Sequence, residues 1–477
     1  MRLKPTEAEQ LLIEHAKAGT ACEAGDGSLP EEENPNEETI IRAEVLRYLI
    51  LGGCDTCKVD QKGLRLVGGH ISGALDLSFQ SIKGALWLRN CRFDQTIEME
   101  QFQCGLLDCS GSSFTGLDAP SLIVNGSLFL RDTIFKAGLL LQGAKIGGQL
   151  LLERAKFLET EQKAINGHFA QIEGGVFLTD CTKKNQVYFT GAIVRGQFYC
   201  VGAHLADQNE HALSMFSAKI EGGVFLHPRI DEEKAKVKRP FIADGGITIV
   251  GSKIGGLYAD HVSLSAAEGE DALRAMNLEV TGPVHLTKTK INGEVRLAGS
   301  KISGNLDFSG AELSNENGHA LNAQRIKVDQ RLVWKNVTIK QGAVSLNGAH
   351  VTELDDDPEN WPSNADALLL DGFTYDRIRG ELSTSPDRDA RLKNGSLYKG
   401  QFFPQPYTQY AKFLRETGHD SQAREVFLER ETLLRKFERA ELSPAYALVR
   451  RVTDSLQRRV VGFGHKPFRS TGWLLAL

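Results

Sequence analysis

Two cysteines separated by two residues are the first candidates for chemistry in this 477-residue chain. Cys54 and Cys57 form its Cys-any-any-Cys pair. Such a pair exchanges thiols for a disulfide when the attacking cysteine lies at a helix N-terminus, where the helix dipole lowers its pKa. Here the pair follows an expected helix and precedes an expected strand. Cys54 and Cys57 are therefore the redox candidates, and the alternative is a linker without chemistry.

Metal and cofactor sites are not predicted by the sequence. A zinc site at Cys54 and Cys57 needs two further ligands, and no second cysteine pair or His-any-any-any-His partner is evident. Glycine is abundant, with 48 residues, but no Gly-any-Gly-any-any-Gly segment stands between a strand and a helix. We expect no cofactor, and we assign no further catalytic residue.

The chain end carries a different chemistry, that of a basic membrane-binding segment. After Leu442 the only acidic residue is Asp454, and the segment ends in Trp473 followed by Leu-Leu-Ala-Leu. A basic helix followed by an amphipathic aromatic residue is typical of contact with an anionic membrane surface. The alternative is a solvated basic helix with a frayed tail. The residues predicted to contact the membrane are Arg450, Arg451, Arg458, Arg459, Lys466, Arg469 and Trp473.

A short repeat between about residues 63 and 383 dominates the architecture. Its phrase is apolar, any, Gly, any, apolar, any, apolar, any, small, small, any, and Ile291, Ile302 and Leu313 are eleven residues apart in it. A unit this short cannot bury its own apolar face, so successive copies must stack. Two phrases make a coil of roughly 22 residues. We expect a mainly β fold: a right-handed parallel β-helix, or pentapeptide-repeat-like solenoid, with helices at both ends.

Four regions follow from the pattern. Residues 1–58 are predicted to form an N-terminal helical cap, with Thr6 and Glu9 as a capping box and a second helix that starts after Asn36 and ends at Gly52. Residues 59–385 form the solenoid. Residues 400–461 form an α-helical hairpin and a basic helix that begins at Ser443 and Pro444, and residues 462–477 form a membrane-proximal tail.

Insertions interrupt the repeat at fairly even intervals, and each one ends in alanine followed by an apolar residue. Loops spaced in this way project from one face of a solenoid, and such a face often binds a partner. We therefore expect a protein partner on the insertion-loop face; the alternative is a set of variable corner loops without a ligand. The insertions end at Ala164-Ile165, Ala212-Leu213, Ala272-Leu273, Ala320-Leu321 and Ala367-Leu368.

Composition narrows the location and the partners. A formal net charge of −5 is small for this length and argues against general nucleic-acid binding. The first residues lack the apolar core of a signal peptide, and no run of 18 apolar residues is present. The eight cysteines are then expected to be reduced thiols. These features predict a cytoplasmic protein, peripheral to the inner membrane.

Five segments together resemble a bacterial family of pentapeptide-repeat-like proteins, many of which are labelled "membrane-associated oxidoreductase". The resemblance covers nearly the whole chain and implies a membrane-associated redox function, although it transfers no catalytic motif to any position. Relatives often continue into hydrophobic helices, whereas this chain stops at Leu477. The segments are Ile41–Gly52, Gly63–Leu77, Leu107–Phe114, Gly126–Asp132 and Gly462–Arg469.

The sequence thus favours a membrane-peripheral β-solenoid that acts as a non-catalytic scaffold or interaction protein. Two alternatives remain open. One is an oxidoreductase, as the family label implies, and Cys54 and Cys57 would then be its candidate residues. The other is a soluble regulatory domain of a membrane helix bundle.

Overall fold

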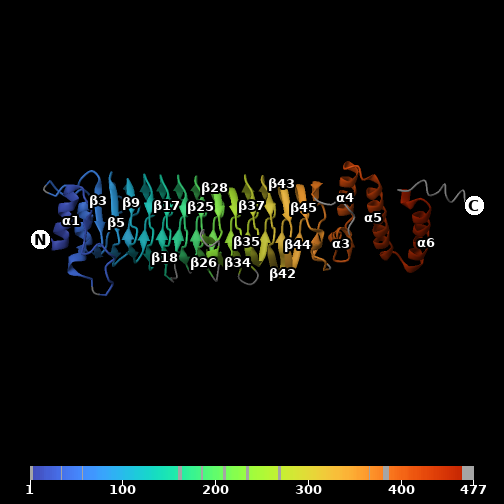
Figure 1. Cartoon of the computed structure of the whole chain (residues 1–477), viewed down its shortest axis with the longest axis horizontal. Helices are drawn as coiled ribbons and strands as arrows, with labels where there is room; N and C mark the ends of the chain where they lie inside the picture. The colour runs from blue at the N-terminus through green and yellow to red at the C-terminus, as the bar shows by residue number, and fades with distance from the viewer. Residues whose placement is uncertain are drawn as a thin grey trace, which may run out of the picture. The chain divides into compact units, whose positions relative to one another are not determined.

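The structure is a computed structural model that describes residues 4–33, 35–55, 57–158, 164–183, 186–207, 211–231, 236–266, 270–364, 366–379 and 386–464 (Figure 1). It divides into two compact units, Met1–Gly293 and Glu294–Leu477. Both units contain coils of a parallel β-solenoid; helices precede the coils in the first unit and follow them in the second. The predicted mainly β solenoid is confirmed.

One coil of the first unit shows how the repeat folds. It has four short strands, two in each of two parallel sheets: β10 (Ser113–Phe114) and β11 (Leu117–Asp118) lie in sheet B, and β12 (Ile123–Val124) and β13 (Leu128–Phe129) lie in sheet A. Leu117 pairs with Leu139 of the next coil, 22 residues later. A coil therefore consists of two eleven-residue phrases, as the spacing predicts.

The remaining coils of the first unit repeat this arrangement. Its other sheet A strands are β3 (Gly63–Val67), β5 (Ala85–Arg89), β8 (Gln103–Cys104), β9 (Leu106–Asp108), β16 (Lys145–Ile146), β17 (Leu150–Leu151), β20 (Gln171–Ile172), β21 (Val176–Phe177), β24 (Ile193–Val194), β25 (Phe198–Tyr199), β28 (Lys219–Phe225), β33 (Lys253–Tyr258), β36 (Glu279–Val280) and β37 (Val284–His285). Its other sheet B strands are β4 (His70–Ser72), β6 (Arg92–Phe93), β7 (Ile97–Glu98), β14 (Ile134–Phe135), β15 (Leu139–Leu140), β18 (Lys156–Phe157), β19 (Ile165–Asn166), β22 (Thr182–Lys183), β23 (Val187–Tyr188), β26 (His204–Ala206), β27 (Leu213–Ser214), β31 (Ile242–Asp244), β32 (Ile247–Thr248), β34 (Ser263–Ser265), β35 (Asp271–Arg274) and β38 (Lys290–Asn292).

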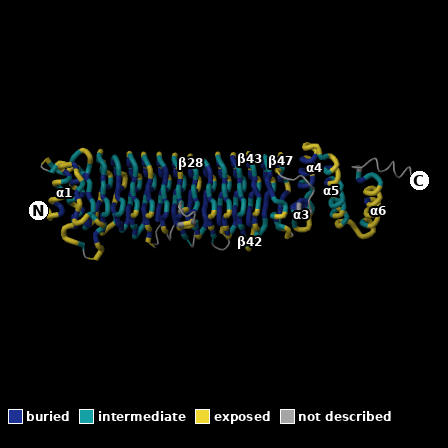
Figure 2. Tube along the Cα trace, viewed as in Figure 1, coloured by how far each residue is buried: buried dark blue, intermediate teal, exposed yellow. Residues whose placement is uncertain are grey.

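The core lies inside the coils, and buried residues recur at the same places from coil to coil (Figure 2). Phe93, Phe114, Phe135 and Phe157 make one column, and their ring centroids are 5.1, 5.0 and 4.8 Å apart. Stacked rings at this separation bury a large apolar area and attract each other. Phe114 and Phe135 therefore each have a phenylalanine ring on both sides.

Glycine marks the corner between the two sheet A strands of a coil, because neighbouring coils approach closely there. A Cβ atom at Gly196 would lie 2.6 Å from the carbonyl carbon of Gly174 in the preceding coil. Atoms cannot approach so closely, so a larger residue would push the two coils apart. This contact explains why the third place of the repeat is so often glycine.

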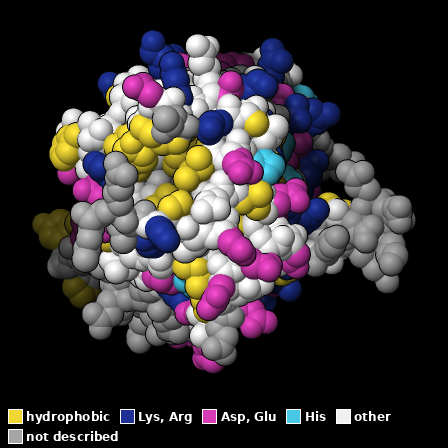
Figure 3. Space-filling view, turned by 90° about the vertical axis from the view of Figure 1, so that its left-hand side faces the viewer, with side chains coloured by type: hydrophobic (Ala, Val, Ile, Leu, Met, Phe, Trp, Pro, Cys, Tyr) yellow, Lys and Arg dark blue, Asp and Glu magenta, His cyan; other side chains and the backbone are white. Residues whose placement is uncertain are grey.

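The N-terminal segment adds two helices and two short strands to the first coil. Helix α1 (Glu7–Ala18) begins with the predicted capping box between Thr6 and Glu9. The buried Glu9 side chain also accepts hydrogen bonds from the guanidinium of Arg42. Strand β1 (Cys22–Glu23) pairs with β3. Viewed from this end, acidic and basic side chains are interspersed among hydrophobic ones (Figure 3).

The expected start of the second helix is wrong. Residues Glu37–Thr39 form a 3-10 turn, η1, and Ile40–Arg42 form strand β2, which pairs with β4 of the first coil. Helix α2 begins only at Ala43 and ends at Ile50. The β-branched Ile40 and Ile41 suit a strand, and Ile41 is fully buried there. A partner strand therefore overrides the helical pattern.

The second unit continues with coils whose strands are longer. One sheet contains β39 (Glu294–Arg296), β42 (Glu312–Asn322), β44 (Thr338–Ser345) and β46 (Leu368–Leu369); the other contains β40 (Lys301–Ile302), β41 (Leu306–Asp307), β43 (Lys327–Trp334), β45 (His350–Asp356) and β47 (Thr374–Ile378).

Four helices follow these coils: α3 (Pro386–Gly395), α4 (Gln405–Glu416), α5 (Asp420–Ala440) and α6 (Pro444–Val460). Helices α4 and α5 are the predicted hairpin around Gly418. The hairpin packs on the last coil, where the Gln409 side chain donates a hydrogen bond of 2.6 Å to the carbonyl of Tyr375. The basic helix α6 is also present where it was predicted.

Helix α3 was not predicted, because Leu392 is the one buried apolar side chain among its described residues. Arg388 and Arg391 are buried as well, and both guanidiniums reach the buried carboxylate of Asp356, at 3.0 and 3.5 Å. These cations hold the pKa of Asp356 below its ordinary value although burial works in the opposite direction. A helix that packs mainly through ion pairs lacks hydrophobic periodicity in its sequence, so the sequence pattern does not predict it.

Replacement of a ring in the phenylalanine column tests the packing of the coils. Phe135→Ala removes a fully buried ring and leaves a cavity between Phe114 and Phe157, so we expect a loss of about 3–5 kcal/mol in unfolding free energy. Denaturant unfolding followed by circular dichroism measures it. Leu158→Ala is the control, since Leu158 is 49% exposed and its loss should cost under about 0.5 kcal/mol. Equal effects of the two variants would contradict the packing argument.

Candidate functional site

The cysteine pair lies just after the C-terminal end of α2. Gly53, whose φ is +70°, turns the chain there, and the Cys54 N–H then donates a hydrogen bond of 3.1 Å to the sulfur of Cys57. Both cysteines are half-buried, and no disulfide joins them. The two redox candidates are thus adjacent, in the position after a helix that the sequence predicts.

The surroundings of this pair disfavour a reactive thiolate. Burial and the side-chain hydrogen bond with Cys54 raise the pKa of the Cys57 thiol above its ordinary value, although the Cys54 N–H works in the opposite direction. The pKa of the neighbouring Tyr48 hydroxyl rises to about 12, chiefly through its hydrogen bond with Cys54. A helix C-terminus also repels negative charge. The geometry therefore keeps Cys57 protonated at neutral pH.

Other cysteines are packing residues of the coils, and potential metal ligands do not cluster in the described parts of the chain. Cys91, Cys109, Cys181 and Cys200 are buried in the coils, where burial raises the thiol pKa of each one. Within the described ranges, no three His, Cys, Asp or Glu side chains come together in a group that could hold a metal ion.

The predicted basic helix α6 packs against α5 through charges. Asp454 of α6 is almost fully buried, and it accepts hydrogen bonds from Arg435, at 2.8 Å, and from Arg439. Burial raises the pKa of Asp454, but these two arginines outweigh burial and lower it overall. The face of α6 that turns toward α5 is therefore polar.

The opposite face of α6 is apolar and exposed. The exposed fractions are 64% for Leu448, 62% for Val452 and 65% for Leu456, and those of Tyr446 and Val449 are similar. Residues four apart lie on one side of a helix, so Leu448, Val452 and Leu456 form a continuous stripe. Sequence reasoning noted the arginines but missed this stripe, although its spacing of four was the signal.

The predicted membrane-contact residues are divided between described and undescribed parts of the chain. Arg451, Arg458 and Arg459 are exposed on α6. Arg450 is also exposed, but it leans toward α5, with a nitrogen 3.7 Å from Asp454 and another 4.0 Å from Glu438. Lys466, Arg469 and Trp473 lie outside the described residues.

No helix in the described parts of the chain combines the length and the apolar content needed to cross a bilayer.

The three insertions of the first unit that end in alanine and an apolar residue leave the solenoid at one corner, whereas the antiparallel hairpin β29–β30 (Arg229–Asp231 and Lys236–Arg239) is inserted between β28 and β31. Ile165, Leu213 and Leu273, which end the first three insertions, occupy the same column of sheet B, together with Val187 and Ile247. Loops that precede the same column must leave from the same side of the coils. The tips of these insertions, at 159–163, 208–210 and 267–269, lie outside the described residues.

Comparison of the chain with known protein families, curated proteins and solved structures finds no match.

The raised pKa of Cys57 makes its alkylation a direct test. We expect iodoacetamide to modify Cys57 several-fold more slowly at pH 7 than it modifies an unstructured peptide thiol, since each added pKa unit lowers the thiolate fraction about tenfold. The rate should rise as pH increases past the ordinary thiol pKa. Mass spectrometry after timed labelling measures it, with Cys57→Ser identifying the labelled peptide. Faster labelling than the peptide at pH 7 would instead indicate an activated, redox-competent thiol.

Proposed function

We propose that this protein is a membrane-peripheral β-solenoid scaffold that binds an anionic membrane surface through α6 and the basic residues that follow it. One observation carries the proposal: α6 turns its charged face toward α5 and leaves Leu448, Val452 and Leu456 exposed. A helix on a monomeric soluble protein normally does the reverse.

The exposed stripe needs a cover, because contiguous apolar surface in water is costly. An amphipathic helix that lies in a bilayer interface buries its apolar face, while arginines at the edges contact lipid headgroups. Arg451 and Arg459 follow Leu448 and Leu456 by three residues, so both lie beside the stripe of α6. Arg458 is exposed too, but it follows Asp454 by four residues and lies on the side toward α5. Apolar area and positive charge together fit an anionic lipid surface.

The coils would then serve as the rigid part that presents a binding surface near the membrane. The shared corner at which these three insertions of the first unit leave sheet B supports a single partner-binding face there, and the partner would be another protein. In this proposal the protein is cytoplasmic, lies against the inner membrane, binds no nucleic acid and does no catalysis. The membrane association agrees with the label of the family that the sequence resembles.

Co-sedimentation with vesicles tests the membrane proposal. The full chain should sediment with vesicles of phosphatidylcholine and phosphatidylglycerol, should not sediment with phosphatidylcholine alone, and should be released by 0.5 M salt, because salt screens the attraction. The variant R451Q/R458Q/R459Q removes three cations, each worth about 1 kcal/mol near an anionic surface. We therefore expect its affinity to fall about 100-fold.

Two further variants separate the stripe from the tail. L448S/V452S/L456S should also reduce binding, because it removes the apolar face, whereas truncation after Val461 should weaken binding only in part. The control K412Q/R424Q/K436Q removes three exposed cations from α4 and α5 and should bind like the wild type. Wild-type binding by both α6 variants, or no binding by the full chain, would contradict the proposal.

A further inference from the structure

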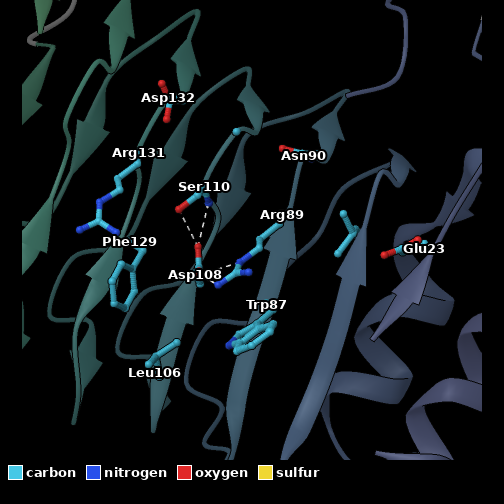
Figure 4. Close-up of a pocket in the computed structure, with 12 residues that line it drawn as sticks. Glu23, Trp87, Arg89, Asn90, Leu106, Asp108, Ser110, Phe129, Arg131 and Asp132 are labelled. Atoms are coloured by element: carbon cyan, nitrogen blue, oxygen red, sulfur yellow. Dashed lines mark hydrogen bonds and ion pairs between the residues drawn. The ribbon is translucent and has the colours of Figure 1, made fainter. Parts of the chain in front are cut away.

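A groove of about 710 Å³ opens on the outer surface of sheet A in the first unit, far in sequence from α6 (Figure 4). It lies across three successive coils, where Trp87 of β5, Asp108 of β9 and Phe129 of β13 occupy the same place in the register. Its volume falls in the range of small-molecule sites. The groove exists because the small Asp108 stands between two aromatic residues.

The same column shows what a filled place looks like. Farther along it, Phe177, Tyr199, Phe225 and Tyr258 are stacked, with ring centroids 5.1, 4.6 and 4.7 Å apart. Phe225, for example, has a ring on each side. Asp108 interrupts this series of aromatic residues. Hydrogen bonds from Ser110 and Arg89 hold its carboxylate in place.

Phe129 forms the apolar wall of the groove. In the described part of the chain no other aromatic ring stacks on it, in contrast to the rings farther along the column. The guanidinium carbon of Arg131 lies 5.3 Å from the ring centroid. The place before Phe129 in the register holds the short side chain of Asp108, so the side of the ring toward Asp108 leaves apolar surface for a ligand.

Trp87 supplies a hydrogen-bond donor that lacks an acceptor. Its Nε1 is buried, and among the described residues it has no hydrogen-bond partner. The guanidiniums of Arg65 and Arg89 lie over its ring, with their central carbons 4.4 and 4.2 Å from the ring centroid. In Figure 4 the nitrogen of the ring points to the side on which Leu106 and Phe129 lie. A buried tryptophan N–H normally finds an acceptor, so an acceptor from a ligand is expected here.

Most charges along the groove are already paired inside the protein; Glu23, which also lines it, has no ion-pair partner among the described residues. Arg89 binds Asp108, with nitrogen–oxygen distances of 2.8 and 2.5 Å. Arg131 pairs with Glu153, and Asp132 receives two hydrogen bonds from Arg154. An additional ionic group would have to compete with these pairs. The groove therefore favours a neutral ligand that both donates and accepts hydrogen bonds.

We propose that this groove binds a neutral oligosaccharide. The hydroxyl groups of a sugar both donate and accept, as the mixture of guanidiniums, carboxylates and the Trp87 N–H requires. The C–H face of a sugar ring is apolar and would pack on Phe129. Arg89 and Asp132 would bind hydroxyl groups from the two sides, and the free Nε1–H of Trp87 would donate to a third.

Isothermal titration calorimetry on the full chain tests this assignment. The neutral probes are maltohexaose, cellohexaose and chitohexaose, and the anionic probe is hexagalacturonate. We expect at least one neutral hexasaccharide to bind and hexagalacturonate to bind more weakly. Phe129→Ala, which removes the apolar wall, should weaken binding about tenfold. Trp87→Phe, which keeps a ring but removes the N–H donor, should weaken it to a similar extent.

A matched control distinguishes the groove from the rest of the column. Tyr199→Ala changes a ring of the same column outside the groove, so its binding should equal that of the wild type. Circular dichroism spectra identical to wild type show that each variant is folded. The proposal is overturned if no neutral probe binds at millimolar concentration, if hexagalacturonate binds best, or if Phe129→Ala and Tyr199→Ala behave alike.

Discussion

The fixed spacing between parallel coils is the constraint on which the rest of this structure depends. Backbone hydrogen bonds such as that from the Leu128 N–H to the Gln149 carbonyl hold successive coils about 4.8 Å apart. Side chains at paired places in the strands therefore stand above one another in successive coils. Columns must be chemically compatible along their length: phenylalanine on phenylalanine inside, and opposite charges such as Asp132 and Arg154 outside. A groove appears where one place in a column holds a short side chain.

Much of the fold could be predicted because the fixed spacing between coils requires apolar residues to recur at regular intervals in the sequence. The 22-residue coil, the capping box at Thr6 and the hairpin around Gly418 all depend on local patterns. The start of α2 and the existence of α3 could not be predicted in the same way. Strand β2 depends on a partner 30 residues later, and α3 depends on the burial of Asp356 beneath its arginines.

The functional surfaces, too, could be predicted only where they depend on local sequence. The basic helix could be predicted because its arginines are visible in the sequence. Its orientation could not be predicted, because it is the contact with α5 that turns Asp454 inward. Likewise, Trp87, Asp108 and Phe129 are 21 residues apart at each step, whereas in another column Ile97 and Leu117 are 20 apart and Leu117 and Leu139 are 22 apart. Which residues share a column depends on small length changes at the corners, and these change from coil to coil.

The two short strands in the N-terminal segment have a consequence for assembly. A stack of parallel coils ends in open backbone donors and acceptors, and such an end can take up another chain and grow into a fibre. Here β1 and β2 pair with the first strands of the two sheets, β3 and β4, and α1 contacts both of the short strands. The open edge is reduced to two residues in one sheet and three in the other, beside a helix. We therefore expect this segment to hinder the stacking of a second molecule on this end of the coils.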